Sequence, residues 1–203
     1  MDTSSFTDQL DLKIWRTKGA RFNAYRRLGK KKNILTYVTS LSSVHLTVIA
    51  TIQLSSLIPL QQNQSTLLNL TTIAISLVIL VYGLIEGGKD YGLKSEKYHM
   101  CGLDLDKIYN KLQLAKDRNN NDLIESISIE YGEILEKYSL NHQDVDDHYF
   151  QLSHKNSFQK FNSCNPYDKL KVWFFYKWLD VFLAAILTIL PIFVSYKIFI
   201  SNN

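Results

Sequence analysis

The sequence predicts an all-α membrane protein, and three observations lead to this prediction. Two apolar runs, residues 34–57 and 67–85, contain no Asp, Glu, Lys or Arg. Each is close to the roughly 20 residues that span a hydrocarbon layer about 30 Å thick. A third apolar run occupies residues 179–200, and the chain before it is charged and has helical periodicity. We therefore expect a transmembrane helical hairpin, a cytosolic helical hairpin or bundle, and a third, C-terminal transmembrane helix.

Residues 1–33 form a basic arm, in which nine basic residues face three acidic ones. A basic arm beside a spanning helix stays on the cytoplasmic side and is attracted to anionic lipid. Residues 1–12 should be loose. An apolar stripe over residues 12–32 predicts an amphipathic helix that lies on the membrane or packs on the cytosolic helices; its members are Leu12, Trp15, Phe22, Tyr25 and Leu28. The basic side chains expected to face lipid or other anions are Arg16, Arg21, Arg26, Arg27, Lys30, Lys31 and Lys32.

Residues 34–87 form the predicted transmembrane hairpin, and its first span is unusually polar. Ser42, His45, Gln53 and Ser56 fall within roughly 80° of arc on a helix. Because polar groups that face lipid are costly, this stripe should face protein or water. Two interpretations remain open at this point: a helix–helix interface in which hydroxyls bond to their own backbone, and a water-lined path. An ionisable group within a span, here His45, is a functional candidate by default.

The second span carries a face of small residues. Thr72, Ser76, Gly83 and Gly87 lie within roughly 60° of arc, and the two glycines have the small-x-x-x-small spacing that lets helices approach closely. We expect this face to pack against another helix, which favours a homo-oligomer. The loop between the spans has no charge, so the basic arm should lie in the cytosol and the loop outside.

Residues 88–164 form the predicted cytosolic region. Apolar residues follow a heptad seam, are interrupted by a polar turn at 117–121, and then resume, which predicts an antiparallel helical hairpin. The two seams consist of Tyr98, Cys101, Leu105, Ile108 and Leu112, and of Leu123, Ile127, Tyr131, Ile134 and Tyr138. Residues 142–160 should form a third, weaker helix. The two cysteines, Cys101 and Cys164, are expected to be free thiols.

Residues 165–203 form a capped helix that leads into the C-terminal transmembrane helix. Asn165 and Pro166 are a typical helix start, and aromatic side chains near 173–178 suit a membrane boundary. Residues 179–200 should span the membrane. The alternative is an apolar helix that lies against the first two from the cytosolic side, which Asp180 and Pro191 keep open.

Motifs for catalysis, cofactors and metals are absent from the sequence. His142, His148 and His154 are six residues apart and would not converge on one helix face, so no metal site is expected. There is no phosphate-binding loop, dinucleotide fingerprint or nucleophile motif. The sequence therefore predicts neither an enzyme nor a cofactor, and the basic arm lacks a motif for specific nucleic-acid binding.

The order of these parts resembles the SLATT domains, the two-transmembrane effectors associated with SMODS nucleotidyltransferases and SLOG domains. The resemblance covers most of residues 12–140. It rests on the basic residues 16–32, the span 67–85 with Gly83, its continuation through residues 86–99, and the helix at 105–112. The third apolar run is an addition to the simple two-span plan.

The resemblance implies a membrane effector of bacterial antiviral defence in the inner membrane, with a cytosolic N-terminus. Such an effector would oligomerise and form a pore or disrupt the membrane, so that the infected cell dies. Its trigger would be a partner system, either a nucleotidyltransferase that makes a nucleotide second messenger or a reverse transcriptase. A second hypothesis is a membrane-anchored scaffold or sensor, whose cytosolic helices recruit a partner without conduction.

Overall fold

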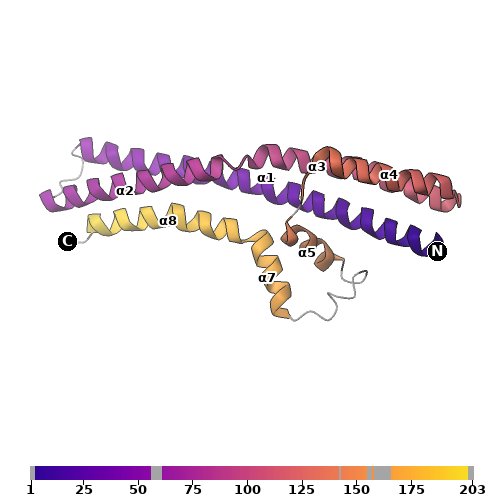
Figure 1. Ribbon diagram of the computed structural model, residues 1–203. Coiled ribbons are helices and arrows are strands. Elements are labelled where there is room, and N and C mark those ends of the chain that lie inside the picture. The colour runs from indigo at the N-terminus through magenta and orange to yellow at the C-terminus, as the bar shows by residue number, and fades with distance from the viewer. Residues whose placement is uncertain (1–2, 56–60, 142, 155–156, 158–165, 201–203) are drawn as a thin grey trace. The chain divides into compact units, whose positions relative to one another are not determined.

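The computed structural model describes residues 3–55, 61–141, 143–154, 157 and 166–200, and all regular structure in them is helical (Figure 1). The helices are α1 Thr3–Ser55, α2 Gln62–Gly87, α3 Tyr91–Asp117, α4 Asn121–Tyr138, α5 Asp144–Ser153, α7 Pro166–Lys177 and α8 Leu179–Ile200. Three of them, α1, α2 and α8, contain stretches long and apolar enough to cross a membrane. The predicted all-α membrane fold is confirmed.

The chain divides into two compact units. One unit, here called the polar unit, comprises Met1–Gly29 and Gly92–Trp178. The other, the spanning unit, comprises Lys30–Tyr91 and Leu179–Asn203. Helix α1 contributes its first half to the polar unit and its second half to the spanning unit.

The N-terminal segment is more ordered than the sequence suggests. Residues 1–12 are expected to be loose, but α1 begins at Thr3, and Leu10 is only 5% exposed. Leu10 and Ile14 belong to the hydrophobic core that α3 and α4 complete. The apolar face of α1 also differs from the predicted stripe, because Leu12 is 45% exposed. The first turns of α1 are mostly polar in composition, but packing of Leu10 and Ile14 against the hairpin stabilises them as a helix.

Helices α3 and α4 form the predicted antiparallel hairpin. All five residues of the first seam are buried, and Ile127, Tyr131 and Ile134 are buried on the second helix. Ion pairs cross the hairpin antiparallel, from Lys111 to Glu130 and from Lys137 to Asp104. The polar turn caps α4, since the Asn120 side chain accepts a hydrogen bond from the Leu123 backbone N–H at 3.0 Å.

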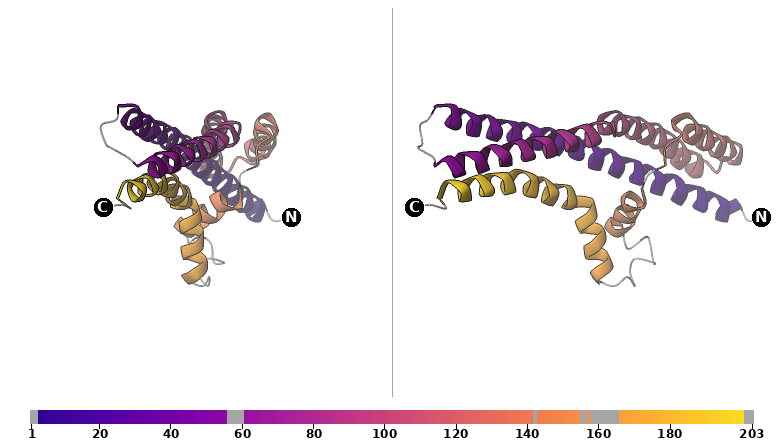
Figure 2. Two further views of the ribbon diagram at one scale, coloured as in Figure 1. Left: turned by 90° about the vertical axis from the view of Figure 1, so that its left-hand side faces the viewer. Right: turned by 60° about the vertical axis from the view of Figure 1, so that its left-hand side comes forward.

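Among the described residues of the polar unit, the remaining helices are α5 and α7, which lie beside each other (Figure 2). The third helix expected at 142–160 is shorter than predicted, since α5 covers only Asp144–Ser153. Tyr149 of α5 and Tyr176 of α7 are stacked, with ring centroids 3.8 Å apart. The long periodic stretch 167–200 is interrupted between Lys177 and Leu179, so α7 is a helix separate from α8.

The spanning unit consists of the second half of α1, α2 and α8, which run side by side in both figures (Figures 1 and 2). Ile49, Leu68 and Val194 form a small core between the three helices. Most other apolar side chains point outward, with Leu70 at 62% and Leu84 at 68% exposure. Apolar surface of this extent requires a nonaqueous environment, which for helices of this length is a lipid bilayer.

Two positions that could interrupt the apolar helices behave differently. Pro191 lies inside α8 without ending it. The helix tolerates it, as transmembrane helices commonly tolerate proline. At the end of α2, by contrast, residues 88–90 form a turn in which Asp90 has a φ of 51°. The helix of the second span therefore ends before α3 begins.

Candidate functional site

The candidate site is the polar face of α1 inside the spanning unit. Ser42 is 4% exposed, and its hydroxyl makes no hydrogen bond to any described residue. The His45 ring nitrogen Nε2 lies 3.5 Å from the Ser195 hydroxyl of α8. Gln53 is partly buried, and its amide nitrogen likewise lacks a hydrogen-bond partner among the described atoms. The stripe predicted from the sequence thus points inward, toward protein, while Ser56 lies outside the described residues.

These polar groups are incompletely satisfied. The contact between His45 and Ser195 is at the outer limit of a hydrogen bond, and the Ser195 hydroxyl also donates to the carbonyl of Pro191 at 2.9 Å. An unpaired buried hydroxyl or amide costs about 1–3 kcal/mol in proteins. The interface between α1 and α8 therefore holds polar groups that packing alone does not explain. Ser195 is the partner that periodicity could not identify, because it lies 150 residues from His45.

A second row of hydroxyls on α1 was missed by the sequence analysis. Each hydroxyl in this row donates to a backbone carbonyl four residues earlier, at 2.8–3.0 Å; the row consists of Thr39, Ser43, Thr47 and Thr51. Its last three members are exposed. Hydroxyls bonded to their own backbone in this way tolerate a lipid environment. In the inward-facing stripe, by contrast, Ser42 and Gln53 lack such hydrogen bonds. The spacing of four residues was the signal that could have revealed this row.

The small-residue face of α2 is only partly used within the chain. The hydroxyls of Thr72 and Ser76 donate to the carbonyls of Leu68 and Ile73 at 2.8 and 2.7 Å. A methyl group added at Gly83 would lie 3.7 Å from the Thr39 side chain, an ordinary packing distance. Gly87 is exposed, with open space where a side chain would begin. The expected packing of this face against a second copy therefore stays a prediction.

A charged cluster joins the three helices at one end of the spanning unit. Lys31 of α1 lies 3.2 Å from the Asp180 carboxylate of α8 and 3.9 Å from the Glu86 carboxylate of α2. Glu86 also pairs with Lys89 and accepts a hydrogen bond from Tyr91. The pKa of the Tyr91 hydroxyl is raised, mainly because the group is partly buried and also because it donates this hydrogen bond to Glu86. The cluster provides Asp180 with a cation, which explains an acidic residue at the start of an apolar helix.

The basic arm does not form one free surface, because Arg16, Arg21 and Arg27 contact other groups of the chain. Arg16 binds the Asp147 carboxylate, with its Nε 2.7 Å from Oδ1. Arg27 binds both carboxylate oxygens of Asp146, at 2.8 and 2.9 Å, and Asp146 is fully buried. These pairs connect α1 to the first turn of α5, where negative charge is favourable.

The side chain of Arg21 is buried even more deeply, at 3% exposure. It lies seven residues from both Ile14 and Leu28, which are core residues of the same helix face. Its guanidinium carbon is 5.5 Å from the centre of the Tyr98 ring, a cation–π contact. Lys31 belongs to the charged cluster described above. Arg26, Lys30 and Lys32 are exposed, as is Arg16 beside its ion pair, and the contact of these side chains with lipid remains a prediction.

The described residues do not converge on a metal site, because no group of three or more His, Cys, Asp or Glu side chains among them is placed to hold an ion. His148 and His154 lie in and after α5, and His142 falls outside the described residues. Cys101 is a buried free thiol, and burial raises its pKa, which makes it unreactive. Cys164 lies outside the described residues.

Together, the exposed apolar helices and the inward-facing stripe on α1 define a class: a helical membrane protein in which one polar face of a span is turned toward its own helices. The model of SMODS and SLOG-associating 2TM effector domain family 5 matches residues 3–197, so the chain belongs to this SLATT family. The resemblance seen in the sequence is thus confirmed. Searches of curated proteins and of solved structures found no match.

The extent of the family match bears on the third apolar helix. The match runs through residue 197 and so includes almost all of α8, which makes this helix part of the family's domain rather than an addition to it. The family description names an effector domain with two transmembrane helices and mentions no catalytic activity. The chain is accordingly a membrane effector domain, associated by family with SMODS and SLOG systems.

Proposed function

We propose that this protein is a membrane effector of bacterial antiviral defence, which oligomerises in the inner membrane and opens a pore or disrupts the bilayer. The observation that carries this proposal is the buried stripe of Ser42, His45 and Gln53, whose polar groups are poorly satisfied. In the resting protein, His45 of this stripe would contact Ser195 of α8, as it does in the structure. In an active oligomer the same groups would face a common axis and be hydrated, which would relieve their unfavourable burial.

Several features of the proposal follow the family resemblance and the charge pattern. The N-terminal arm and the polar unit would lie in the cytosol, where a nucleotide second messenger or a reverse-transcriptase partner system would act on them. Gly83 and Gly87 would provide a close contact between copies, because Gly87 has open space beside it. Conduction would explain how such an effector stops the growth of an infected cell.

The test is the replacement of both His45 and Gln53 by leucine. The double variant should insert as well as the parent, because the span becomes more apolar. On controlled expression the parent should depolarise the membrane and arrest growth, whereas the double variant should do neither once the signal is normalised to inserted protein. The matched control is Thr47→Leu with Thr51→Leu, which makes the same helix more apolar on its exposed side.

Depolarisation at the level of the parent by a normally inserted His45→Leu/Gln53→Leu protein would exclude the stripe as the conduction path. The second function, a scaffold that recruits a partner, would then be favoured. It has one supporting observation: α4 exposes Ile129 (61%) in a hollow lined by Asp122, Glu125 and Glu133. A partner with a basic apolar segment would fit this face.

A further inference from the structure

Helix α7 presents an apolar face whose side chains are exposed. Tyr167, Leu170, Phe174 and Trp178 are 69%, 60%, 38% and 44% exposed. Tyr167, Leu170 and Phe174 are separated by three and four residues, so they lie within about 60° of arc on one side of the helix, and Trp178 follows directly after its last residue. Phe175 is also exposed, at 49%, next to this face. Four of these five side chains are aromatic, which is unusual for a surface in contact with water.

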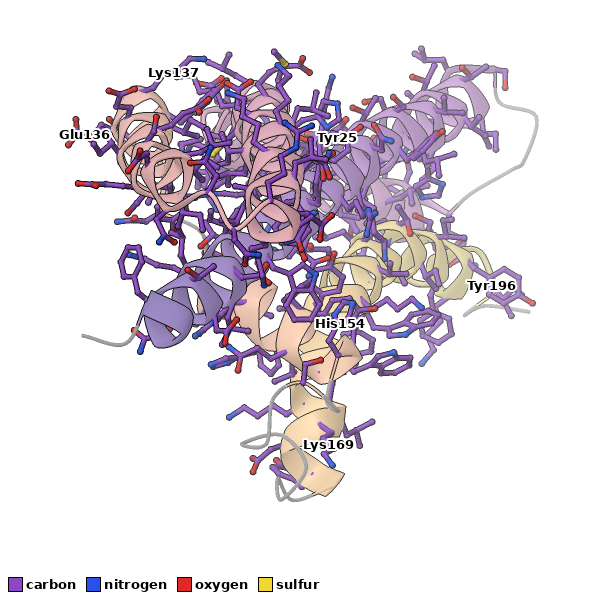
Figure 3. The ribbon with its side chains drawn as sticks, turned by 90° about the vertical axis from the view of Figure 1, so that its right-hand side faces the viewer. Tyr25, Glu136, Lys137, His154, Lys169 and Tyr196 are labelled. Atoms are coloured by element: carbon purple, nitrogen blue, oxygen red, sulfur yellow. The ribbon has the colours of Figure 1, made fainter. Side chains whose placement is uncertain are left out.

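The opposite face of α7 fixes its orientation. Tyr176 is stacked on Tyr149 of α5, and its hydroxyl donates to the backbone carbonyl of Asn23 at 3.1 Å. Val172 and Lys169 lie on the same side and are half-buried. Figure 3 labels Lys169 on α7 and shows side chains extending from this helix away from its neighbours. The aromatic face therefore points outward because the other side of the helix is occupied.

Charge and continuity indicate what this face contacts. Lys171 and Lys177 flank the aromatic arc, and Lys177 lies over the Trp173 ring at 5.9 Å. Tryptophan and tyrosine concentrate at membrane–water interfaces, and lysines flanking them attract anionic headgroups. The chain then passes directly from Trp178 into Leu179, the first residue of an apolar helix long enough to cross a membrane. A protein partner would not require this position next to a span.

We propose that α7 lies flat in the headgroup region of the membrane that α8 enters, with its aromatic face toward the acyl chains and its lysines at anionic phosphates. This assigns the surface-binding role to α7, whereas the basic arm uses Arg16, Arg21 and Arg27 within the protein. Such a helix is typically buried by roughly 5–10 Å at the boundary between headgroups and acyl chains. The proposal is independent of conduction, because it concerns only where the polar unit meets the bilayer.

The test uses the full-length protein in nanodiscs that contain anionic lipid, with bromines placed on the acyl chains close to the headgroup or near the chain end. The chain has three tryptophans, Trp15, Trp173 and Trp178, so single-tryptophan proteins are made by Trp→Phe changes at the other two positions. A fourth protein carries all three Trp→Phe changes and Tyr167→Trp. Residue 167 is the decisive position, because it lies about 16 Å along the helix from Trp178.

We expect the shallow bromines to lower the emission from residues 167, 173 and 178 roughly twofold, and the deep bromines to lower it less, as for a helix lying at the interface. The control is the protein with only Trp15, which packs on Phe150 within the polar unit and should be unaffected by either lipid. Quenching at 178 but not at 167 would mean that α7 stands away from the membrane, and would overturn the proposal.

Two further outcomes would also overturn it. If residue 167 is not quenched and the protein in the nanodisc doubles in mass with increasing concentration, a second copy covers the aromatic face. If residue 167 is not quenched and its emission maximum shows full hydration in a monomer, the face is open to water. The expected pattern of depth, the same at both ends of α7, can arise only from a helix parallel to the bilayer surface.

Discussion

The two units differ in the polar contacts between their helices, although buried polar atoms without a described partner occur in both: Arg21 and His99 in the polar unit, Ser42 and Gln53 in the spanning unit. In the polar unit, Arg27 meets a fully buried Asp146 through two hydrogen bonds, and Arg16 meets Asp147. In the spanning unit, Ser42 has no partner among the described residues, and His45 reaches Ser195 only at 3.5 Å. Paired charges hold one arrangement of helices, because any shift leaves an uncompensated charge. Hydroxyl, imidazole and amide groups with weak partners hold their arrangement less tightly, which would suit the rearrangement proposed above.

The largest effect is expected when the buried ion pair of the polar unit is broken. Asp146→Ala leaves the Arg27 guanidinium partly buried without its carboxylate, so the free energy of unfolding should fall by about 3–5 kcal/mol. Unfolding of the polar unit can be followed by the fluorescence of Trp15, which packs on Phe150 of α5.

Asp144→Ala is the matched control for this variant, because Asp144 lies in the same first turn of α5 but is exposed. It should cost less than about 0.5 kcal/mol, as surface substitutions usually do. Equal losses for the two variants would mean that helix-dipole effects, and not the buried ion pair, stabilise this contact.

An intermediate effect is expected at the charged cluster of the spanning unit. Asp180→Asn removes the negative charge of the closer of the two carboxylates near Lys31. The free energy of unfolding should fall by about 1–2 kcal/mol, which lies between the values for an exposed ion pair and for a buried hydrogen bond to a charged group. Thermal unfolding in detergent gives this loss. Asp168→Asn on the exposed side of α7 serves as the control. Unchanged stability would show that Glu86 alone satisfies Lys31.

The smallest effect should come from Ser42→Ala. Since the Ser42 hydroxyl is buried and has no described partner, its removal should leave stability unchanged or raise it by up to about 1 kcal/mol. The same denaturation measurement applies, and Thr47→Ala, which removes a hydroxyl already bonded to the backbone, gives the reference. A loss above 1 kcal/mol for Ser42→Ala would reveal a partner for this hydroxyl and weaken the contrast between the units.

The parts of the fold with local periodicity could be predicted from the sequence. The seam from Tyr98 to Leu112 and the turn at 117–121 were predicted because heptad spacing and a polar interruption are local features. The same reasoning selected Leu123 in α4, whereas Ile124 is the more buried neighbour, at 6% against 36%. An error of one residue is expected where a helix begins.

The role of Arg21 could not be predicted in this way. Hydropathy assigns an arginine to the surface, yet this residue occupies a core position because its neighbours at seven-residue spacing, Ile14 and Leu28, are buried. The partners of Arg16 and Arg27 lie 131 and 119 residues away, beyond the range of any local pattern. In the candidate site, Ser42, His45 and Gln53 were found because they share one helix face, but the pairing with Ser195 depends on tertiary structure.

The absence of Asp, Glu, Lys and Arg from the polar stripe has a consequence for ion selectivity. Channels discriminate between ions with rings of charged side chains or with closely spaced backbone carbonyls that replace the hydration shell. The apolar runs 34–57 and 67–85 contain no Asp, Glu, Lys or Arg, and the stripe offers a hydroxyl, an imidazole and an amide. A conducting form lined by these groups would neither exclude anions nor concentrate cations strongly. It would dissipate gradients of several ions at once instead of transporting one of them.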